Sequence, residues 1–240
     1  MIARSLRALL AHLVDYAGLY PPAALPLAEV VANYERYLRS PEAWMLNRLV
    51  LPIGKLGEAP LGMCWRVALL VDGEPGPLPR QIETLETKTG GRLSLPTYCE
   101  VPLDRVENGY AKIRTGGLIA EATPPAGVLA DFLCGAAARR LPFKATAGLH
   151  HPIRSGMHGF LNVFAGAVFA WLGTDRDALT RLLDETDPQA FEFRDDELRW
   201  RDWRATTAEV ERARRDFAHS FGSCSFVEPV DGLRALGLLE

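Results

Sequence analysis

The sequence predicts an α/β protein with a (β/α) barrel-like parallel sheet and an added β-hairpin near its C-terminus. Apolar strand-like runs alternate with helical patterns along most of the chain, which is typical of parallel sheets. The length of 240 residues suits a barrel that forms one domain. Residues 191–193 and 198–200 alternate apolar and charged side chains on either side of a charged turn, which predicts the hairpin. We therefore expect one irregular barrel domain over residues 1–240.

The first half of the chain contains helical and extended patterns in turn. Leucines at helical spacing predict the first helix, and Pro26 suits the first turn of the second. The double proline Pro21-Pro22 forbids helix, so residues 14–23 are expected to form a loop. The segments expected in this half are helices over 3–14, 26–38 and 80–89, and strands over 46–53, 65–71 and 95–101.

The second half continues the alternation and ends in a glycine- and serine-containing segment. The expected segments are strands over 110–114 and 143–149, helices over 125–139, 157–171, 176–183 and 207–219, and a short closing helix. Residues 221–229 are expected to form a closing loop. Because active sites of α/β barrels lie at the carboxyl ends of strands, candidate residues are sought there.

Composition restricts the class of protein. The formal charge of −3 argues against a broad nucleic-acid-binding face. The longest apolar run, residues 160–172, is too short to span a membrane, and the N-terminus lacks a signal-peptide cleavage site. Four scattered cysteines indicate neither a disulfide framework nor a zinc site. We expect a cytoplasmic protein without membrane or nucleic-acid partners, and a homo-oligomer remains an open option.

Two lysines stand where buried strands are expected. Lys112 lies in Tyr110–Arg114 and Lys144 lies in the strand that begins at Phe143, and both strands close on glycines. Since lysine is seldom buried without a partner, two such strands side by side indicate a functional site. Two neighbouring cations would lower each other's pKa and make one amine nucleophilic. The structural alternative is that each lysine pairs with a carboxylate, with Glu100 the obvious partner.

Short segments carry two resemblances. DYAGLYPPA, AKIRTGG, FKATAGLHHP, HGFLNVF and FGSCSFVEP together resemble a family of uncharacterised bacterial proteins, which implies no assigned activity. FKATAGL and KIRTGG are also similar to the two lysine strands of deoxyribose-phosphate aldolase, although their order along the chain is reversed. This second resemblance implies that Lys144 is the Schiff-base lysine and that Lys112 is the neighbour that lowers its pKa.

The remaining candidates surround these lysines. Arg114 and the turn Thr115-Gly116-Gly117 could bind a phosphate or carboxylate, or the glycines could simply form a tight turn. His150 and His151 are candidates for proton transfer, but adjacent residues of an extended segment point opposite ways, so one of them could be structural. Further candidates for contacting the substrate are Asp15, Thr146 and Asn162.

Three hypotheses of function follow. The first is a lyase or aldolase-like enzyme without a cofactor that activates a small anionic carbonyl substrate, with Lys144, Lys112, His150, His151 and Glu100 as catalytic residues. The second is a metal-dependent hydrolase or lyase in which His150 or His151 binds the metal with His158 and with Glu100 or Asp15. The third is a non-catalytic protein that binds anionic metabolites. We expect Lys112, Arg114, Lys144 and one of the two adjacent histidines to share one cleft, with Glu100 in contact with a lysine.

Overall fold

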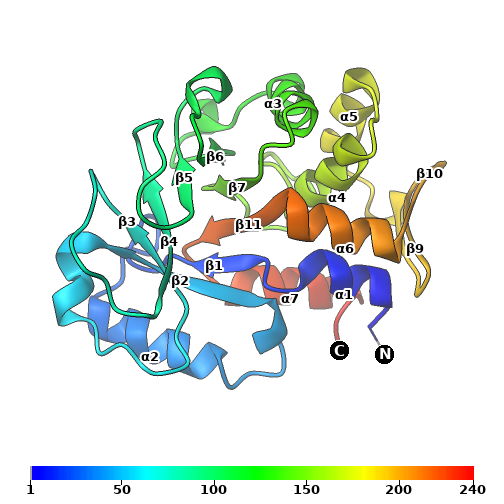
Figure 1. Ribbon diagram of the computed structural model, residues 1–240. Coiled ribbons are helices and arrows are strands. Elements are labelled where there is room, and N and C mark those ends of the chain that lie inside the picture. Colours follow the sequence, from blue (N-terminus) through cyan, green and yellow to red (C-terminus); the bar gives the residue numbers. More distant parts are fainter. Residues whose placement is uncertain (1) are drawn as a thin grey trace.

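The computed structural model describes residues 2–240 and shows a closed barrel of parallel strands (Figure 1). The predicted barrel is therefore confirmed. Around the barrel the order is β1-β11-β7-β6-β5-β4-β3-β2. The strands are β1 (Val14–Tyr16), β2 (Leu46–Pro52), β3 (Val67–Leu70), β4 (Ile82–Thr87), β5 (Thr97–Cys99), β6 (Tyr110–Arg114), β7 (Phe143–Thr146) and β11 (Ala218–Ser223).

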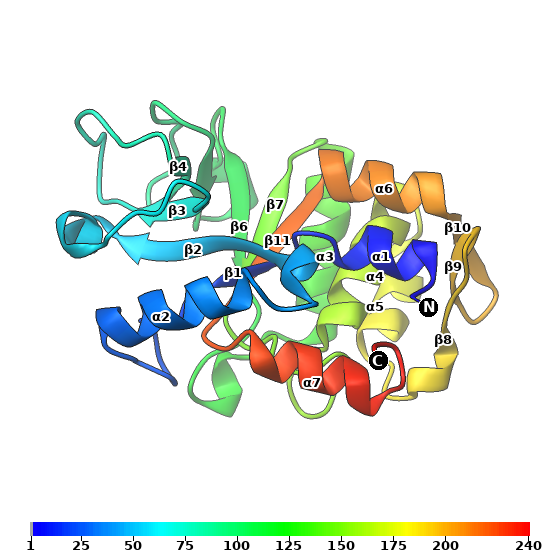
Figure 2. The ribbon, with the colours of Figure 1, turned by 90° about the horizontal axis from the view of Figure 1, so that it is seen from below.

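The helices are distributed unevenly around the barrel. The connections from β3 to β4 and from β4 to β5 contain no helix, whereas helices gather beside β1, β11, β7 and β6 (Figures 1 and 2). The helices are α1 (Arg4–Leu10), α2 (Leu27–Tyr37), α3 (Ala126–Ala138), α4 (Phe160–Trp171), α5 (Arg176–Leu183), α6 (Thr207–Asp216) and α7 (Val227–Ala235). No helix between residues 2 and 240 is both long and apolar enough to cross a bilayer.

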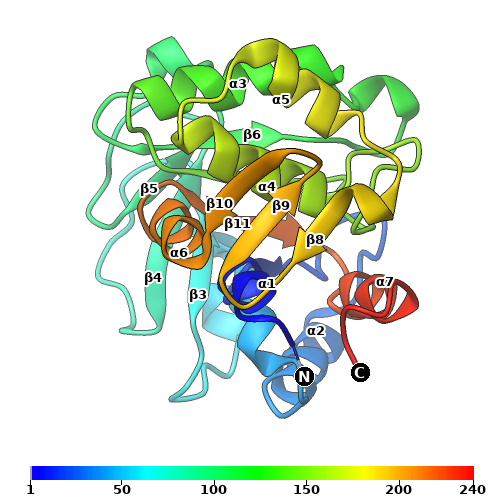
Figure 3. The ribbon, with the colours of Figure 1, turned by 90° about the vertical axis from the view of Figure 1, so that its right-hand side faces the viewer.

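A small antiparallel sheet lies outside the barrel, between α5 and α6 in the chain. It contains the predicted hairpin, β8 (Phe191–Phe193) and β9 (Glu197–Trp200), and a third strand, β10 (Trp203–Thr206). The sheet packs near α1 and α6 at one end of the molecule (Figure 3). Thr206 then begins α6 with a capping box, because its hydroxyl accepts from the Glu209 N–H and the Glu209 carboxylate accepts from the Thr206 N–H.

The apolar core lies between the barrel wall and the helices. Phe143 of β7 stacks with Phe164 of α4, and Phe221 of β11 stacks with Phe160 of the same helix. Because side chains alternate along a strand, Lys144, the neighbour of Phe143, points into the barrel. Barrel interiors are usually filled by Val, Ile and Leu. This barrel instead has charged and hydrogen-bonding side chains along its axis.

Three sequence-based assignments were wrong. Residues 82–87, expected within a polar helix, form strand β4. Residues 14–16, expected in a loop, form β1, and residues 218–223, expected at a helix end and in a closing loop, form β11. Each of these strands sends polar side chains into the barrel, so none has the apolar alternation by which strands are recognised in a sequence.

Candidate functional site

Alternating positive and negative side chains cross the barrel interior. The Lys144 Nζ lies 2.5 Å from the Asp15 Oδ2 and 2.5 Å from the Glu86 Oε1. The Lys112 Nζ lies 2.9 Å from the Glu86 Oε2 and 3.0 Å from the Glu100 Oε2. The series ends at Arg114, whose Nη2 lies 3.1 Å from the Glu100 Oε1. These six residues, the ionic ladder, are Asp15, Lys144, Glu86, Lys112, Glu100 and Arg114.

Strand register explains how the ladder assembles. In the pairing of β6 with β7, Lys112 lies directly beside Lys144, as expected from the two lysine strands. Glu86 of β4 reaches both ammonium groups, one with each carboxylate oxygen. The predicted contact of Glu100 with a lysine is present in the pair with Lys112. The lysines are therefore bridged by a carboxylate, which is the structural alternative considered from the sequence.

The carboxylates keep both lysines protonated. Burial alone lowers the pKa of Lys144, but Asp15 and Glu86 outweigh it, so the pKa is raised above 10.5. The pKa of Lys112 is raised as well, because Glu86 and Glu100 outweigh its burial and the charge of Lys144. Burial raises the pKa of Glu86, but Lys144 and Lys112 more than reverse this and lower it to about 2. The expected mutual lowering of the lysine pKa values is thus overturned by the carboxylates.

Four hydrogen-bond donors fix the position of the Asp15 carboxylate. Its Oδ1 accepts from the Asn47 Nδ2 at 2.7 Å and from the Arg48 backbone N–H at 3.1 Å. Its Oδ2 accepts from the Ser220 hydroxyl at 2.8 Å, in addition to Lys144. Each oxygen of this carboxylate, 1% exposed, therefore has two hydrogen-bond donors. These bonds fix the position of the carboxylate beside the lysine.

The ladder forms one wall of a cavity of about 780 Å³ at the carboxyl ends of the strands. Ladder residues that line it are Lys144, Glu86, Lys112, Glu100 and Arg114, and His150, Thr146 and Gly117 are also in its wall. The predicted convergence of Lys112, Arg114, Lys144 and one histidine on a single cleft is confirmed. A cavity of this volume accommodates a small metabolite.

Two further side chains of this cavity have the properties of functional groups. The His150 Nδ1 lies 2.7 Å from the Glu228 Oε2, so a carboxylate orients this imidazole. The buried Tyr20 hydroxyl, which also lines the cavity, has no hydrogen-bond partner among residues 2–240. Since buried hydroxyls are normally paired, the Tyr20 hydroxyl is available to a bound molecule.

Comparison with protein-family models, curated proteins and solved structures gives no match. The resemblances carried by short segments therefore remain hypotheses. The chemistry must be inferred from the cavity and its lining residues.

The expected anion-binding turn is only partly in the cavity. Thr115 is buried, and its hydroxyl donates to the Ala147 carbonyl at 2.5 Å while its N–H donates to the Thr146 carbonyl at 2.9 Å. Gly116 packs against Gly148, where an added Cβ would lie 2.8 Å from the Gly148 Cα. Thr115 and Gly116 thus serve backbone packing between two strand ends, and Gly117 alone of the three lines the cavity.

Asn162 is a structural residue. Its Nδ2 donates to the Leu182 and Glu185 carbonyls, and its Oδ1 accepts from the Arg154 N–H. The buried amide thus joins the C-terminal end of α5 to the segment at Arg154 and does not line this cavity, which corrects its expected role in binding substrate. From the sequence, Asn162 was a candidate for binding substrate because it is a polar residue in an otherwise apolar helix.

The histidines do not gather into a metal site. His151 is exposed and does not line the cavity, in agreement with the opposite directions of adjacent side chains. The buried His158 donates through Nε2 to the Pro124 carbonyl and accepts at Nδ1 from Arg154, and its burial lowers its pKa. In the part of the chain that the structure describes, no three His, Cys, Asp or Glu side chains are placed to hold a metal ion. The arrangement proposed for His158 with His150 or His151 is therefore wrong.

Sequence reasoning missed Glu86, Tyr20 and Glu228. Glu86 was placed on the solvated face of a helix, yet it is 3% exposed and bridges both lysines. The order Ile-Glu-Thr-Leu-Glu-Thr in residues 82–87 combines β-branched residues with a glycine- and proline-rich loop before it, a signal that favours a strand. No sequence signal pairs Glu228 with His150, because the two are 78 positions apart.

Proposed function

We propose that this barrel is a lyase of aldolase type, in which Lys144 activates the carbonyl group of a small anionic compound. The observation that carries the proposal is a lysine 1% exposed, in the wall of a metabolite-sized cavity and 2.5 Å from each of two carboxylates. A lysine amine that attacks a carbonyl must first lose a proton. Asp15 and Glu86 are in hydrogen-bond contact with that proton.

Binding of a substrate would change the balance of burial and charge that raises the pKa of Lys144. When a carbonyl compound displaces water from the cavity, the buried charges are less well solvated, and transfer of a proton from Lys144 to Asp15 or Glu86 replaces an ion pair with a neutral pair. The short contacts mean that this transfer needs no movement of heavy atoms. Lys112 stays protonated between Glu86 and Glu100 and holds positive charge beside the reacting amine.

The covalent step forms an imine and releases water. The neutral Nζ of Lys144 attacks the carbonyl carbon, and a proton passes from the nitrogen to the carbonyl oxygen to give a carbinolamine. This oxygen then leaves as water with the proton that Asp15 or Glu86 took from Lys144, and the nitrogen retains a double bond to carbon and a positive charge. Cleavage of the adjacent carbon–carbon bond sends its electron pair toward that nitrogen and gives an enamine, while the β-hydroxyl loses its proton as an aldehyde departs. Protonation of the enamine and hydrolysis then restore the lysine.

Two groups in the cavity can move these protons. The His150 imidazole, oriented by Glu228, is suited to accept the proton of the β-hydroxyl. The Tyr20 hydroxyl, which lacks a partner within residues 2–240, is suited to donate a hydrogen bond to the substrate oxygen. Its pKa is raised to about 12 by burial and by Glu86, so it is a donor at neutral pH.

The anionic group of the substrate would lie at the rim. The ladder contains three cations and three carboxylates, so its interior offers no net positive charge. Arg114, whose side chain is 53% exposed, and the exposed Lys88 both line the mouth of the cavity and can turn toward a phosphate or carboxylate. The reacting carbonyl would then point inward to Lys144.

Reductive trapping tests the proposal. The protein is incubated with pyruvate, glycolaldehyde or glyceraldehyde 3-phosphate, reduced with borohydride and digested, and the labelled peptide is identified by mass spectrometry. We expect label on Lys144 and a large decrease in Lys144→Met, with Lys55→Met, which removes an exposed lysine that does not line the cavity, as the matched control that retains the label. Because the wild-type peptide map locates the label, the test does not depend on the folding of Lys144→Met. Label confined to exposed lysines would overturn the proposal.

The neutralised ladder also favours a second candidate, a non-catalytic protein that binds small metabolites in the same cavity. Paired lysines are compatible with binding through fixed hydrogen bonds alone. In that case carbonyl compounds would raise the melting temperature without forming a reducible adduct on Lys144.

A further inference from the structure

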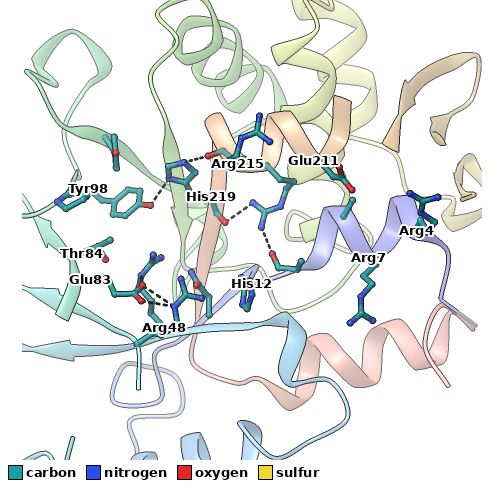
Figure 4. A pocket seen from close by; sticks show the side chains of 17 residues that line it. Arg4, Arg7, His12, Arg48, Glu83, Thr84, Tyr98, Glu211, Arg215 and His219 are labelled. Atoms are coloured by element: carbon teal, nitrogen blue, oxygen red, sulfur yellow. Dashed lines mark hydrogen bonds and ion pairs between the residues drawn. The ribbon is translucent and has the colours of Figure 1, made fainter. Parts of the chain in front are cut away.

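A second cavity opens at the opposite, amino end of the barrel. Its volume is about 700 Å³, and it lies between the helices α1 and α6 and the first residues of β2, β4 and β11 (Figure 4). We call it the basal cavity. It is separate from the cavity described above, since no residue lines both.

The basal cavity is strongly cationic. Six arginines but only two glutamates line it, although the whole chain has a formal charge of −3. Arg48 and Arg66 share one carboxylate, Glu83, which lies 2.9 Å from the Nε of each. Their Nη atoms have no hydrogen-bond partner among residues 2–240. One positive charge of this pair is therefore uncompensated.

Arg214 adds a second uncompensated charge. Its guanidinium is buried and donates to the backbone carbonyls of Leu9, Ala11, Ala218 and His219. No carboxylate pairs with it anywhere in the described chain. Burial lowers its pKa to about 10, so it remains charged at neutral pH. A buried cation held only by carbonyl dipoles favours an anion nearby.

Strand irregularities direct extra side chains into this cavity. In the pairing of β3 with β4, Val67 lies beside Ile82, but the next residue, Ala68, lies beside Thr84. Glu83 is therefore an extra residue in β4. Similar shifts insert His219 in β11 and one residue in β2 near Arg48. Such bulges re-aim side chains at barrel rims and beside functional sites. Three of them at one end of this barrel bring Asn47, Arg48, Glu83, Thr84 and His219 to the same cavity.

Thr84 supplies an independent indication of a ligand. Its side chain is 4% exposed and lines the basal cavity, yet its hydroxyl has no hydrogen-bond partner in residues 2–240. Nearby His219 is already used, because its Nε2 donates to the Arg215 carbonyl and its Nδ1 accepts from the Tyr98 hydroxyl at 2.7 Å. An unpaired buried donor among guanidinium groups matches the oxygen atoms of an anion.

We propose that the basal cavity binds a small phosphate-bearing anion. Guanidinium groups bind phosphate oxygens through paired N–H donors. Arg48 and Arg66 both bond to the Glu83 carboxylate through Nε, and the N–H groups on their Nη atoms have no partner among residues 2–240. The Thr84 hydroxyl supplies a further donor from the barrel interior. This site does not depend on the lyase proposal, because its residues are distinct from those that line the first cavity.

Calorimetric titration with sodium pyrophosphate at fixed ionic strength tests this proposal. We expect saturable binding with one site per chain. Arg66→Gln should weaken it about tenfold by removing a charge-assisted contact, and Thr84→Val about threefold. Thr84→Val is the sharper variant, because it removes a hydroxyl that bonds to nothing in the described protein and therefore should not reduce stability.

Two controls locate the binding. Arg212→Gln removes an exposed arginine of α6 that does not line the basal cavity and should leave affinity within about twofold. Arg114→Gln, at the rim of the other cavity, should do the same. The proposal is wrong if the wild type shows no saturable binding, if Arg212→Gln weakens binding as much as Arg66→Gln, or if Arg114→Gln alone abolishes it.

Discussion

Replacing Glu86 with glutamine should remove the central contact of the ionic ladder and little else. Glutamine has the size of glutamate, so no cavity is created, but Lys144 and Lys112 lose their shared negative charge. Lys144 keeps Asp15 and Lys112 keeps Glu100, so neither ammonium is left alone. The variant should therefore fold with reduced stability.

The magnitude follows from the pKa of Glu86. Its fall from 4.5 to about 2 on folding corresponds to about 3 kcal/mol of stability at neutral pH. Because the folded pKa is the lower one, this stability is present above about pH 5 and is lost as the pH falls toward 2. The lysines act in the opposite sense, since their raised pKa values remove stability only as the pH rises above 10.5. Near pH 3, about 2 kcal/mol of the Glu86 contribution should be gone.

Urea unfolding followed by tryptophan fluorescence measures this directly. At pH 7 we expect Glu86→Gln to lower the free energy of unfolding by about 3 kcal/mol. Between about pH 5 and pH 3 the wild type should lose about 2 kcal/mol more than the variant. Glu58→Gln, which removes an exposed partner of Lys55, should change stability by less than about 0.5 kcal/mol. A loss below about 1 kcal/mol at pH 7, or an unchanged acid dependence in Glu86→Gln, would refute the reasoning.

Three further variants test packing and binding. Tyr20→Phe removes a buried hydroxyl without a partner in the described chain, so urea unfolding should show no loss of stability while the yield of trapped adduct falls at least about tenfold. Gly116→Ala should cost about 2 kcal/mol by urea unfolding, because its Cβ meets the facing strand end, whereas Gly91→Ala meets nothing and should be neutral; equal effects would contradict this packing. Ser220→Ala should cost about 2 kcal/mol by removing a hydrogen bond to the ionised Asp15, and a neutral result would mean that this bond is not needed.

The sequence predicted the fold class because the apolar strands and the helices alternate clearly. It could not predict β1 or β11, since Val14–Tyr16 is short and Ala218–Ser223 contains histidine, serines and glycine. These strands are stabilised by pairing with neighbours distant in the chain, which local propensity cannot reveal. β4 was assigned as helix because Glu83 and Glu86 are three positions apart, a spacing that also places two residues on one helical face.

The lysines were identifiable because each interrupts an apolar strand, whereas only one of their three carboxylate partners was predicted to contact them. Glu100 could be predicted from the short connection between β5 and β6. Glu86 and Asp15 come from strands that the sequence did not show, so the balance of charges around Lys144 could not be predicted. The pKa of a buried lysine depends on that balance, and its direction was therefore predicted incorrectly.

The position of β11 has a consequence for the order of assembly during synthesis. This strand lies between β1 and β7, and it is the last strand of the barrel to leave the ribosome. Until then the nascent sheet has two unpaired edges, which are prone to pair with other chains. Asp15 is made early but receives the Ser220 hydrogen bond only when β11 inserts. Long-range closure of this kind gives a high contact order, so we expect folding to be slow and the barrel to close only after β11 has emerged.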